Sequence, residues 1–183
     1  MADELLHAAG IAVRDLDAIA FGRGPGGFTG LRIAAGVAQG LAAGIGKPVL
    51  PVSDLAALAA AGARTEGAGR VLACMDARMG QVYWAAFDCT GSAPVPLTEE
   101  HLTDPQGVRL PEGKAWFAAG HGFGAYPALA TRLQSRLAGV DASLLPRASD
   151  IARIAAGDLE AGKGVAASRA VPVYLRNEVV HKR

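Results

Sequence analysis

The chain has 183 residues, of which 51% are hydrophobic and 19% are charged, and its formal net charge is +1. This composition is typical of a globular protein with a substantial core, and it excludes an intrinsically disordered chain. The balanced charge gives no electrostatic argument for nucleic acid, and the sequence shows neither a secretion signal nor an apolar run of about 20 residues that would span a membrane.

The first part of the chain alternates between helices and strands, which favours parallel strands joined by crossover helices. Gly10 is the expected end of the first helix, and Ser53 is the expected N-terminal cap of the third. The predicted elements are a helix over 2–9, a strand over 17–22, a helix over 29–44, a strand over 47–53 and a helix over 54–62.

A polar stretch of small residues at 63–69 is the expected boundary between two parts of the chain. After it, 70–77 and 81–88 are predicted to form an antiparallel hairpin, because a tight turn separates two apolar runs. The two cysteines, Cys74 and Cys89, fall in or next to these runs without a metal-binding spacing. They indicate reduced thiols in a cytoplasmic protein.

The last part of the chain is predicted to contain mainly loops, one strand and two helices. Ser149 is the expected cap of the second of these helices. The predicted elements are a loop with one helical turn over 91–113, a strand over 114–120, a helix over 125–139, a helix over 150–162 and an extended tail over 170–183.

The stretch FGRGPGGFTGLRIAAGVAQGLAAG, at 21–44, raises the question of a phosphate-binding loop. Three of its glycines match the dinucleotide pattern G-x-G-x-x-G between a strand and a helix; they are Gly22, Gly24 and Gly27. The match is weak, because Pro25 removes one N–H donor from the loop. In addition, Asp54 follows the capping Ser53, so it is better placed at a helix start than at a ribose.

The helix after this loop offers a second explanation of the glycines. Gly36, Gly40 and Gly44 are four residues apart, so they lie on one helix face. Beside them runs an apolar row that consists of Ile33, Val37 and Leu41. Each glycine costs about 1 kcal/mol relative to alanine in a helix interior, so a close contact must offset this cost. The pattern leaves open whether that contact is the protein's own sheet or the helix of a partner.

Three segments together resemble the TsaB family, which is also written YeaZ. They are FGRGPGGFTGLRI at 21–33, DARMGQVYW at 76–84 and PVYLRNEVVHKR at 172–183. Two weaker matches are GHGFGAY at 120–126 and ASDIARIA at 148–155. The resemblance extends over essentially the whole chain.

This resemblance implies an α/β protein with the actin/sugar-kinase/Hsp70-like (ASKHA) fold, which has two lobes. We expect residues 1–68 to be the remnant of the N-terminal lobe, with the partner-binding helix, and residues 69–183 to form the C-terminal lobe. Members of the family begin with a hairpin, a third strand and a long first helix. This chain starts near the end of that helix, so we expect the first lobe to be truncated at its N-terminus. Either Met1 is a late start codon, which we favour, or the chain is a degraded paralogue.

The resemblance also implies a function, namely a non-catalytic subunit that binds and activates a TsaD-like transferase in the threonylcarbamoyl-adenosine modification of tRNA. A TsaE-like ATPase is the second expected partner, and tRNA is contacted indirectly. No cofactor is expected, except a nucleotide at an interface shared with partners. The alternatives are a homodimer through the same helix, or an ATP-dependent enzyme or M22-type peptidase of the same fold that acts alone.

The partner-binding surface is expected on the glycine-row helix and at its start. Its predicted residues are Phe28, Thr29, Arg32, Ile33, Gly36, Val37, Gly40, Leu41 and Gly44. A separate set in the preceding loop could contact phosphate or a partner loop; it consists of Arg23, Gly24, Gly26 and Gly27.

The residues offer little for catalysis. The four histidines are scattered without a zinc-binding spacing, and no serine lies in G-x-S-x-G. Asp76 and Asp88 end the strands of one hairpin, so they are predicted to be turn or surface carboxylates rather than an acid–base pair. The sequence HGFG at 121–124 is predicted to be a turn between a strand and a helix. We therefore expect no catalytic residues and no metal site.

Overall fold

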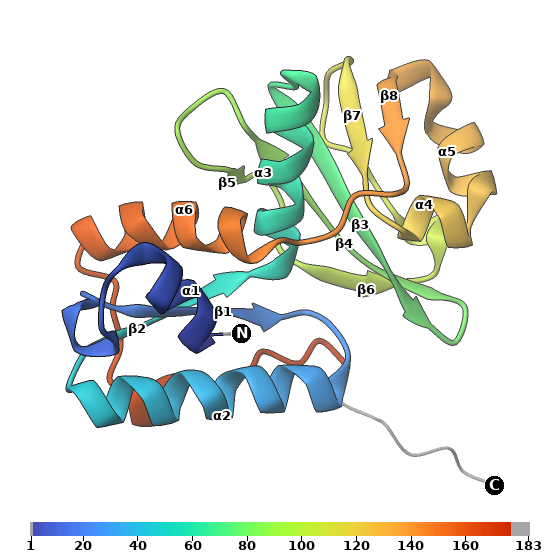
Figure 1. Ribbon diagram of the computed structural model, residues 1–183. Coiled ribbons are helices and arrows are strands. Elements are labelled where there is room, and N and C mark those ends of the chain that lie inside the picture. The colour runs from blue at the N-terminus through green and yellow to red at the C-terminus, as the bar shows by residue number, and fades with distance from the viewer. Residues whose placement is uncertain (1, 177–183) are drawn as a thin grey trace, which may run out of the picture.

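Two β-sheets, each covered by helices, lie on either side of α3 in the computed structural model, which describes residues 2–176 (Figure 1). The smaller sheet holds two parallel strands, β1 (Ile19–Gly24) and β2 (Val49–Ser53). Helix α2 (Phe28–Ile45) connects them and covers one face. Helix α6 (Ala148–Glu160) covers the other face, and α1 (Ala2–Ala9) lies in front (Figure 1).

The larger sheet holds six strands in a mixed arrangement, with the order β5-β4-β3-β7-β8 and with β6 paired to β4. β3 and β4 form an antiparallel hairpin, whereas β7 is parallel to both β3 and β8. The strands are β3 (Arg70–Arg78), β4 (Gln81–Asp88), β5 (Val95–Pro96), β6 (His101–Thr103), β7 (Trp116–Ala119) and β8 (Leu137–Asp141).

Helices cover both faces of the larger sheet. Helix α3 (Asp54–Glu66) packs on one face through Leu55 and Leu58, while Trp84 and Trp116 belong to the core of the other. Helices α4 (Gly122–Ala125) and α5 (Pro127–Leu133) contribute to that second core. The 3₁₀ turns are Val13–Asp15, Pro105–Gly107, Gln134–Arg136 and Ala167–Arg169.

Most predicted elements are confirmed within a few residues, including the hairpin and the five segments before it. The Ser53 cap is confirmed, since its hydroxyl accepts a hydrogen bond from the Ala56 N–H at 3.1 Å. The predicted Ser149 cap is wrong, because α6 begins earlier and Arg147 is its N-cap residue without a side-chain bond.

The helix predicted over 125–139 is wrong in its last third. The helical part ends at Leu133, a 3₁₀ turn follows, and residues 137–141 form β8. This strand pairs in parallel with β7, so tertiary pairing at the sheet edge decides its conformation over the local helical pattern. The stretch 91–113, predicted as mainly loop, contains the two short strands β5 and β6 on the edge of β4.

The contacts between the two sheets do not follow one boundary in the sequence. Helix α6 packs on β1 and β2, and Val165 forms an antiparallel bridge with Val49. The division of the chain at residues 68 and 69 stays a prediction about domains. In the structure, the later segment 148–174 packs on the sheet of the earlier part.

Candidate partner-binding site

Helix α2 has one face that packs on its own sheet. The residues of this face are Leu31, Ala35, Ala38 and Ala42, which are all buried. They contact Phe21 and Val49 of the two strands. Because three of the four are alanines, the helix lies close to the sheet. Gly27 begins the helix, and Gly46 ends it in the left-handed conformation that favours glycine, with φ of 66°.

The opposite face of α2 is uncovered. The side chains of Ile33, Val37 and Leu41 are 62%, 56% and 36% exposed. A Cβ atom added at Gly36, Gly40 or Gly44 would meet nothing within 4 Å. The glycines therefore do not serve close packing of α2 on the protein's own sheet, and that interpretation of the pattern is wrong.

This face is unusual because α2 is 18 residues long and mostly apolar. Among the described helices, α2 alone is long and apolar enough to cross a membrane by length and composition, with 22% of it buried. That finding is weak evidence for a membrane, since core helices of soluble proteins pass the same test. The small buried share shows that most of this apolar helix is not covered by the rest of the protein.

An aromatic cluster lies at the beginning of α2. The guanidinium carbon of Arg32 is 3.7 Å from the ring centroid of Phe28, and the rings of Phe28 and Tyr174 are 5.2 Å apart. The Arg32 Nε also donates a hydrogen bond of 3.1 Å to the Tyr174 hydroxyl. Thr29, another predicted site residue, is exposed beside them. Sequence reasoning missed Tyr174, because nothing local predicts that residue 174 lies beside residue 28.

The glycine loop before α2 packs against Asp54. The Gly24 N–H donates a hydrogen bond of 2.8 Å to the Asp54 carboxylate, and the same carboxylate leaves no room for a side chain at Gly22. Gly24 has a φ of 107°, and a Cβ there would meet the Val173 carbonyl at 2.8 Å. Two glycines of the dinucleotide pattern thus have a structural explanation.

Arg23 is engaged within the chain. Its guanidinium forms two hydrogen bonds with the Glu100 carboxylate, at 2.9 and 3.1 Å, in a half-buried position. Gly26 and Gly27 face the cleft described next. The contact of these loop residues with phosphate or a partner stays a prediction.

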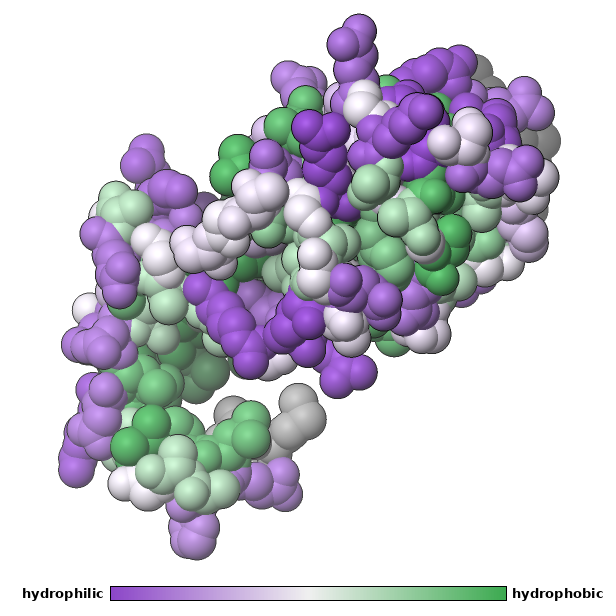
Figure 2. Space-filling model, turned by 90° about the horizontal axis from the view of Figure 1, so that it is seen from above, coloured by the Kyte–Doolittle hydropathy of each residue, from purple (hydrophilic) through white to green (hydrophobic). Residues whose placement is uncertain are grey.

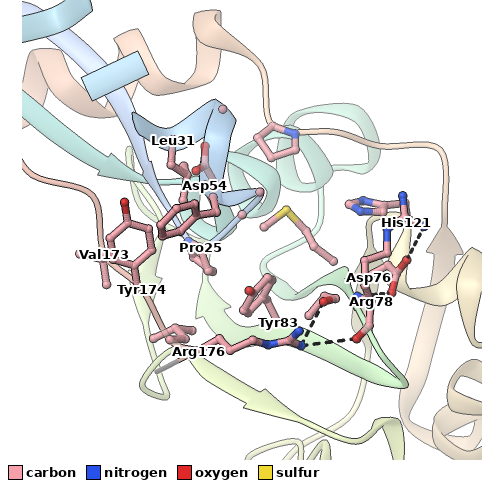
Figure 3. A pocket seen from close by; sticks show the side chains of 18 residues that line it. Pro25, Leu31, Asp54, Asp76, Arg78, Tyr83, His121, Val173, Tyr174 and Arg176 are labelled. Carbon is pink, nitrogen blue, oxygen red and sulfur yellow. Dashed lines mark hydrogen bonds and ion pairs between the residues drawn. The ribbon is translucent and has the colours of Figure 1, made fainter. Parts of the chain in front are cut away.

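A cleft of about 680 Å³ separates the two sheets next to the start of α2 (Figure 3). Its lining combines Asp54 and the glycine loop with Asp76, Tyr83 and His121 from the larger sheet. Burial raises the pKa of Asp54 from its ordinary value of 3.8 to about 6, while the Gly24 N–H and Arg23 act in the opposite direction. The volume suits a small-molecule ligand.

The polar groups at and near the cleft differ in how far they are engaged by the rest of the protein. The Asp76 carboxylate accepts hydrogen bonds from the Arg78 N–H at 2.8 Å and from the Tyr126 hydroxyl at 3.2 Å. The buried Nδ1 of His121 has no hydrogen-bond partner among the described residues. Burial raises the pKa of the Cys74 thiol to about 12, which disfavours a thiolate nucleophile.

The other candidates for chemistry are also accounted for. Asp88 lies at the far end of the hairpin from Asp76 and accepts hydrogen bonds from Thr90 in a turn. The HGFG sequence leads from β7 into α4, as predicted. Within residues 2–176, no group of three His, Cys, Asp or Glu side chains could hold a metal ion.

A second groove, of about 690 Å³, lies on the opposite side of the smaller sheet. Its lining is mainly apolar, with Asp17 as a charged residue, and comes from α1, β1 and the segment before it, β2 and α6. It includes Leu5, Leu16, Ile19, Leu50 and Ile151. Figure 2 shows hydrophobic side chains gathered at this end of the molecule, whereas hydrophilic side chains are more frequent at the other end. The groove lacks the polar groups that a specific small-molecule site needs.

Two helix-covered α/β sheets on either side of a cleft define a two-lobe protein of the ASKHA class, as predicted. A family model described as TsaD, tRNA N6-adenosine threonylcarbamoyltransferase, matches residues 1–177. The chain belongs to the TsaB family, because it is 43% identical over 189 residues to the tRNA threonylcarbamoyladenosine biosynthesis protein TsaB of Escherichia coli. That match covers 100% of this chain and 80% of the relative.

Two further comparisons agree with this assignment. The TsaB protein of Haemophilus influenzae is 35% identical over 192 residues, which cover 100% of this chain and 80% of the relative. The solved structure of YeaZ from Pseudomonas aeruginosa superposes with a TM-score of 0.87 at 44% identity, and the match covers 96% of this chain and 81% of that one.

Proposed function

We propose that this chain is a non-catalytic subunit in tRNA threonylcarbamoyladenosine synthesis that docks on a TsaD-like transferase and activates it. The observation that carries the proposal is the exposed face of α2, where Ile33, Val37 and Leu41 run beside a row of bare glycines. An apolar ridge next to a groove fits the helix of a partner at close backbone distance.

The energetics of the free chain support a partner on this face. Each interior glycine costs about 1 kcal/mol relative to alanine, and no contact within the described chain offsets this at Gly36 or Gly40. Full burial of a large aliphatic side chain contributes about 1.5–3 kcal/mol, so a partner helix that covers the exposed parts of these three side chains would gain a free energy comparable to the cost of the glycines.

The rest of the proposal follows the family. A TsaE-like ATPase is the second partner, tRNA is reached through the transferase, and the complex works in the bacterial cytoplasm. The chain needs no cofactor of its own, and a nucleotide binds only at an interface with partners. The support for a non-catalytic role is that Asp76 and Asp88 hold turns and that Cys74 is a buried thiol of raised pKa.

The same face could instead pair with a second copy of the chain, or the cleft could serve an ATP-dependent enzyme or M22-type peptidase. The homodimer has a specific observation in its favour, since the exposed face is self-complementary in its ridge and groove. The experiment below therefore measures both the transferase complex and the mass of the free chain.

The test is the substitution Gly40→Leu. Overpacking typically costs 1–3 kcal/mol, so we expect binding to the TsaD-like transferase of the same organism to weaken by about tenfold or more. The free chain should keep its circular-dichroism spectrum, because the position is open. Gly157→Leu is the matched control, since Gly157 is also an exposed helix glycine with nothing within 4 Å.

Calorimetry would measure the affinity, and analytical ultracentrifugation would measure self-association. Unchanged transferase binding by a folded Gly40→Leu variant would remove this face from the interface. A substitution that dissociates only a homodimer would favour self-association as the role of the face.

A further inference from the structure

The C-terminal segment 171–176, here called the strap, runs from α2 to the opposite side of the cleft (Figure 3). It follows the smaller sheet first. The Gln39 side chain donates a hydrogen bond of 3.0 Å to the Ala170 carbonyl, and the Val173 N–H donates one of 2.8 Å to the Arg23 carbonyl. The strap therefore lies along α2 and the glycine loop.

Tyr174 is the first anchor of the strap. Its ring lies against Phe28 and its hydroxyl accepts a hydrogen bond from Arg32, so it holds two successive turns of α2 together with the strap. Phe28 is 42% exposed and Tyr174 is 38% exposed, which places this anchor at the edge of the open face of α2.

Arg176 is the second anchor, and it lies on the other side of the cleft. Its guanidinium donates hydrogen bonds to the Ala77 carbonyl at 3.1 Å and to the Gln81 side chain at 2.8 Å, and it contacts the Met79 sulfur. Met79 lies in the turn between β3 and β4, and Ala77 and Gln81 lie in the strands on either side of it. One planar guanidinium thus holds both strands at the turn.

The turn that Arg176 holds is conformationally unfavourable by itself. Arg78 and Met79 have φ values of 62° and 56°, in the left-handed region that non-glycine residues rarely adopt. Such conformations persist only where the surroundings determine them. The β3–β4 ladder, the Asp76 carboxylate and the contacts of Arg176 all surround this turn, so the strap is one of the supports of its shape.

We propose that the strap couples the beginning of α2 to the β3–β4 turn, so that the two sides of the cleft move as one unit. Only one residue, Leu175, separates the anchors, so a shift of Tyr174 on α2 pulls on Arg176. A partner that contacts Phe28 and Arg32 thereby changes the turn and the width of the cleft. This last consequence rests on the proposed docking role of α2, whereas the coupling itself is a property of the free chain.

The test is hydrogen exchange of the free, full-length chain in which one anchor is removed and the other side is observed. Arg176→Ala should raise exchange not only at residues 78–81 but also at residues 24–31. Tyr174→Ala should likewise raise exchange near its own anchor, at residues 24–31, and also at the distant turn, at residues 78–81. We expect about fivefold at the distant site, which is the effect of about one net hydrogen bond on a local opening equilibrium.

Two variants serve as controls. Val171→Ala changes an exposed side chain of the same strap, and it should leave both sites unchanged. Tyr174→Phe keeps the ring on Phe28 but removes the hydrogen bond with Arg32, so it should give a smaller effect than Tyr174→Ala, which removes both contacts. If each anchor variant affects only its own side, or neither side, the strap is a local support and the proposal is wrong. Because no partner takes part, this result is independent of the docking proposal.

Discussion

At the scale of single residues, Asp54 connects three parts of the molecule. It begins α3, accepts the hydrogen bond of Gly24, and lines the cleft. Burial raises its pKa from 3.8 to about 6, so the folded protein holds a proton at pH values where the unfolded chain has lost it. The contribution of this group to stability is therefore largest at low pH, and it falls as the pH rises from about 4 to 6.

Asp54→Asn should remove this pH dependence. An asparagine side-chain oxygen can still accept the hydrogen bond of Gly24, but it carries no charge that burial disfavours. We expect the variant to be more stable than the wild type at pH 8, by roughly 1–2 kcal/mol after allowance for partial exposure, and equally stable near pH 4. Urea unfolding at pH 4, 6 and 8 would measure both proteins.

Other titrating groups cancel in the difference between the two proteins. A constant difference in free energy of unfolding across this pH range would show that burial does not perturb Asp54. A less stable variant at pH 8 would show that the charge itself holds the glycine loop, through Arg23 or Gly24.

Contacts between single residues that are distant in the chain could not be predicted from the sequence. Asp54 could be placed at a helix start from the Ser53 cap, but its contact with Gly24 joins residues 30 positions apart. The contacts of Tyr174 with Phe28 and of Arg23 with Glu100 span still larger separations. No periodicity or local motif encodes such pairs, since they depend on how the two sheets are placed.

At the scale of elements, α2 shows what a sequence pattern can establish. The pattern placed a glycine row and an apolar row on neighbouring faces, and the structure confirms this arrangement. Whether these rows face the protein's own sheet or face outward could be decided only from the structure. The buried residues are mainly alanines, so a ranking by hydrophobicity points to the exposed row of Ile33, Val37 and Leu41 as the core face.

The sheets were predictable to different degrees. The β3–β4 hairpin was clear from two apolar runs around a tight turn, because its pairing is local. Strand β8 was not, since its conformation follows from pairing with β7, whose paired residues lie 21 or 22 positions earlier. No residue of β8 is fully buried, and its sequence LAGVD has no clear apolar run. The sequence therefore carries only a weak strand signal.

Two glycine substitutions in α2 should change the stability of the free chain in opposite directions. Gly36→Ala lies in the helix interior with open space around it, so it should stabilise the chain by about 1 kcal/mol. Gly46→Ala has equally open space but a φ of 66°, so it should destabilise by a similar amount. Thermal unfolding would show shifts of about 2–4 °C for a chain of this size.

The measurement needs several protein concentrations, because self-association through α2 would add its own stability. A destabilising effect of Gly36→Ala that grows with concentration would mean that the glycine row is already filled by a second copy. An effect that is independent of concentration and has the predicted sign would support an open face in the free chain.

At the scale of the whole molecule, the fold presents a ligand-sized cleft. Several of its polar side chains form hydrogen bonds that hold the segments around it. Asp54 holds the glycine loop, Asp76 holds the hairpin and Tyr126, and Arg176 holds the turn. A general acid or base needs a free position toward a substrate, and a nucleophile needs an activating base nearby. Asp54 and Asp76 are engaged with the protein itself, and the buried Nδ1 of His121 has no partner among the described residues that would form an acid–base pair with it.

The purified chain should therefore show only background rates with ATP and with peptide substrates. Asp76→Ala and His121→Ala remove the two cleft groups that come nearest to an acid–base role, and Asp88→Ala removes a turn carboxylate at the far end of the hairpin as a control. All three variants should give the same background as the wild type. Activity that survives repeated purification, and that is lost in Asp76→Ala or His121→Ala but kept in Asp88→Ala, would establish an enzyme in this cleft and contradict the proposed accessory role.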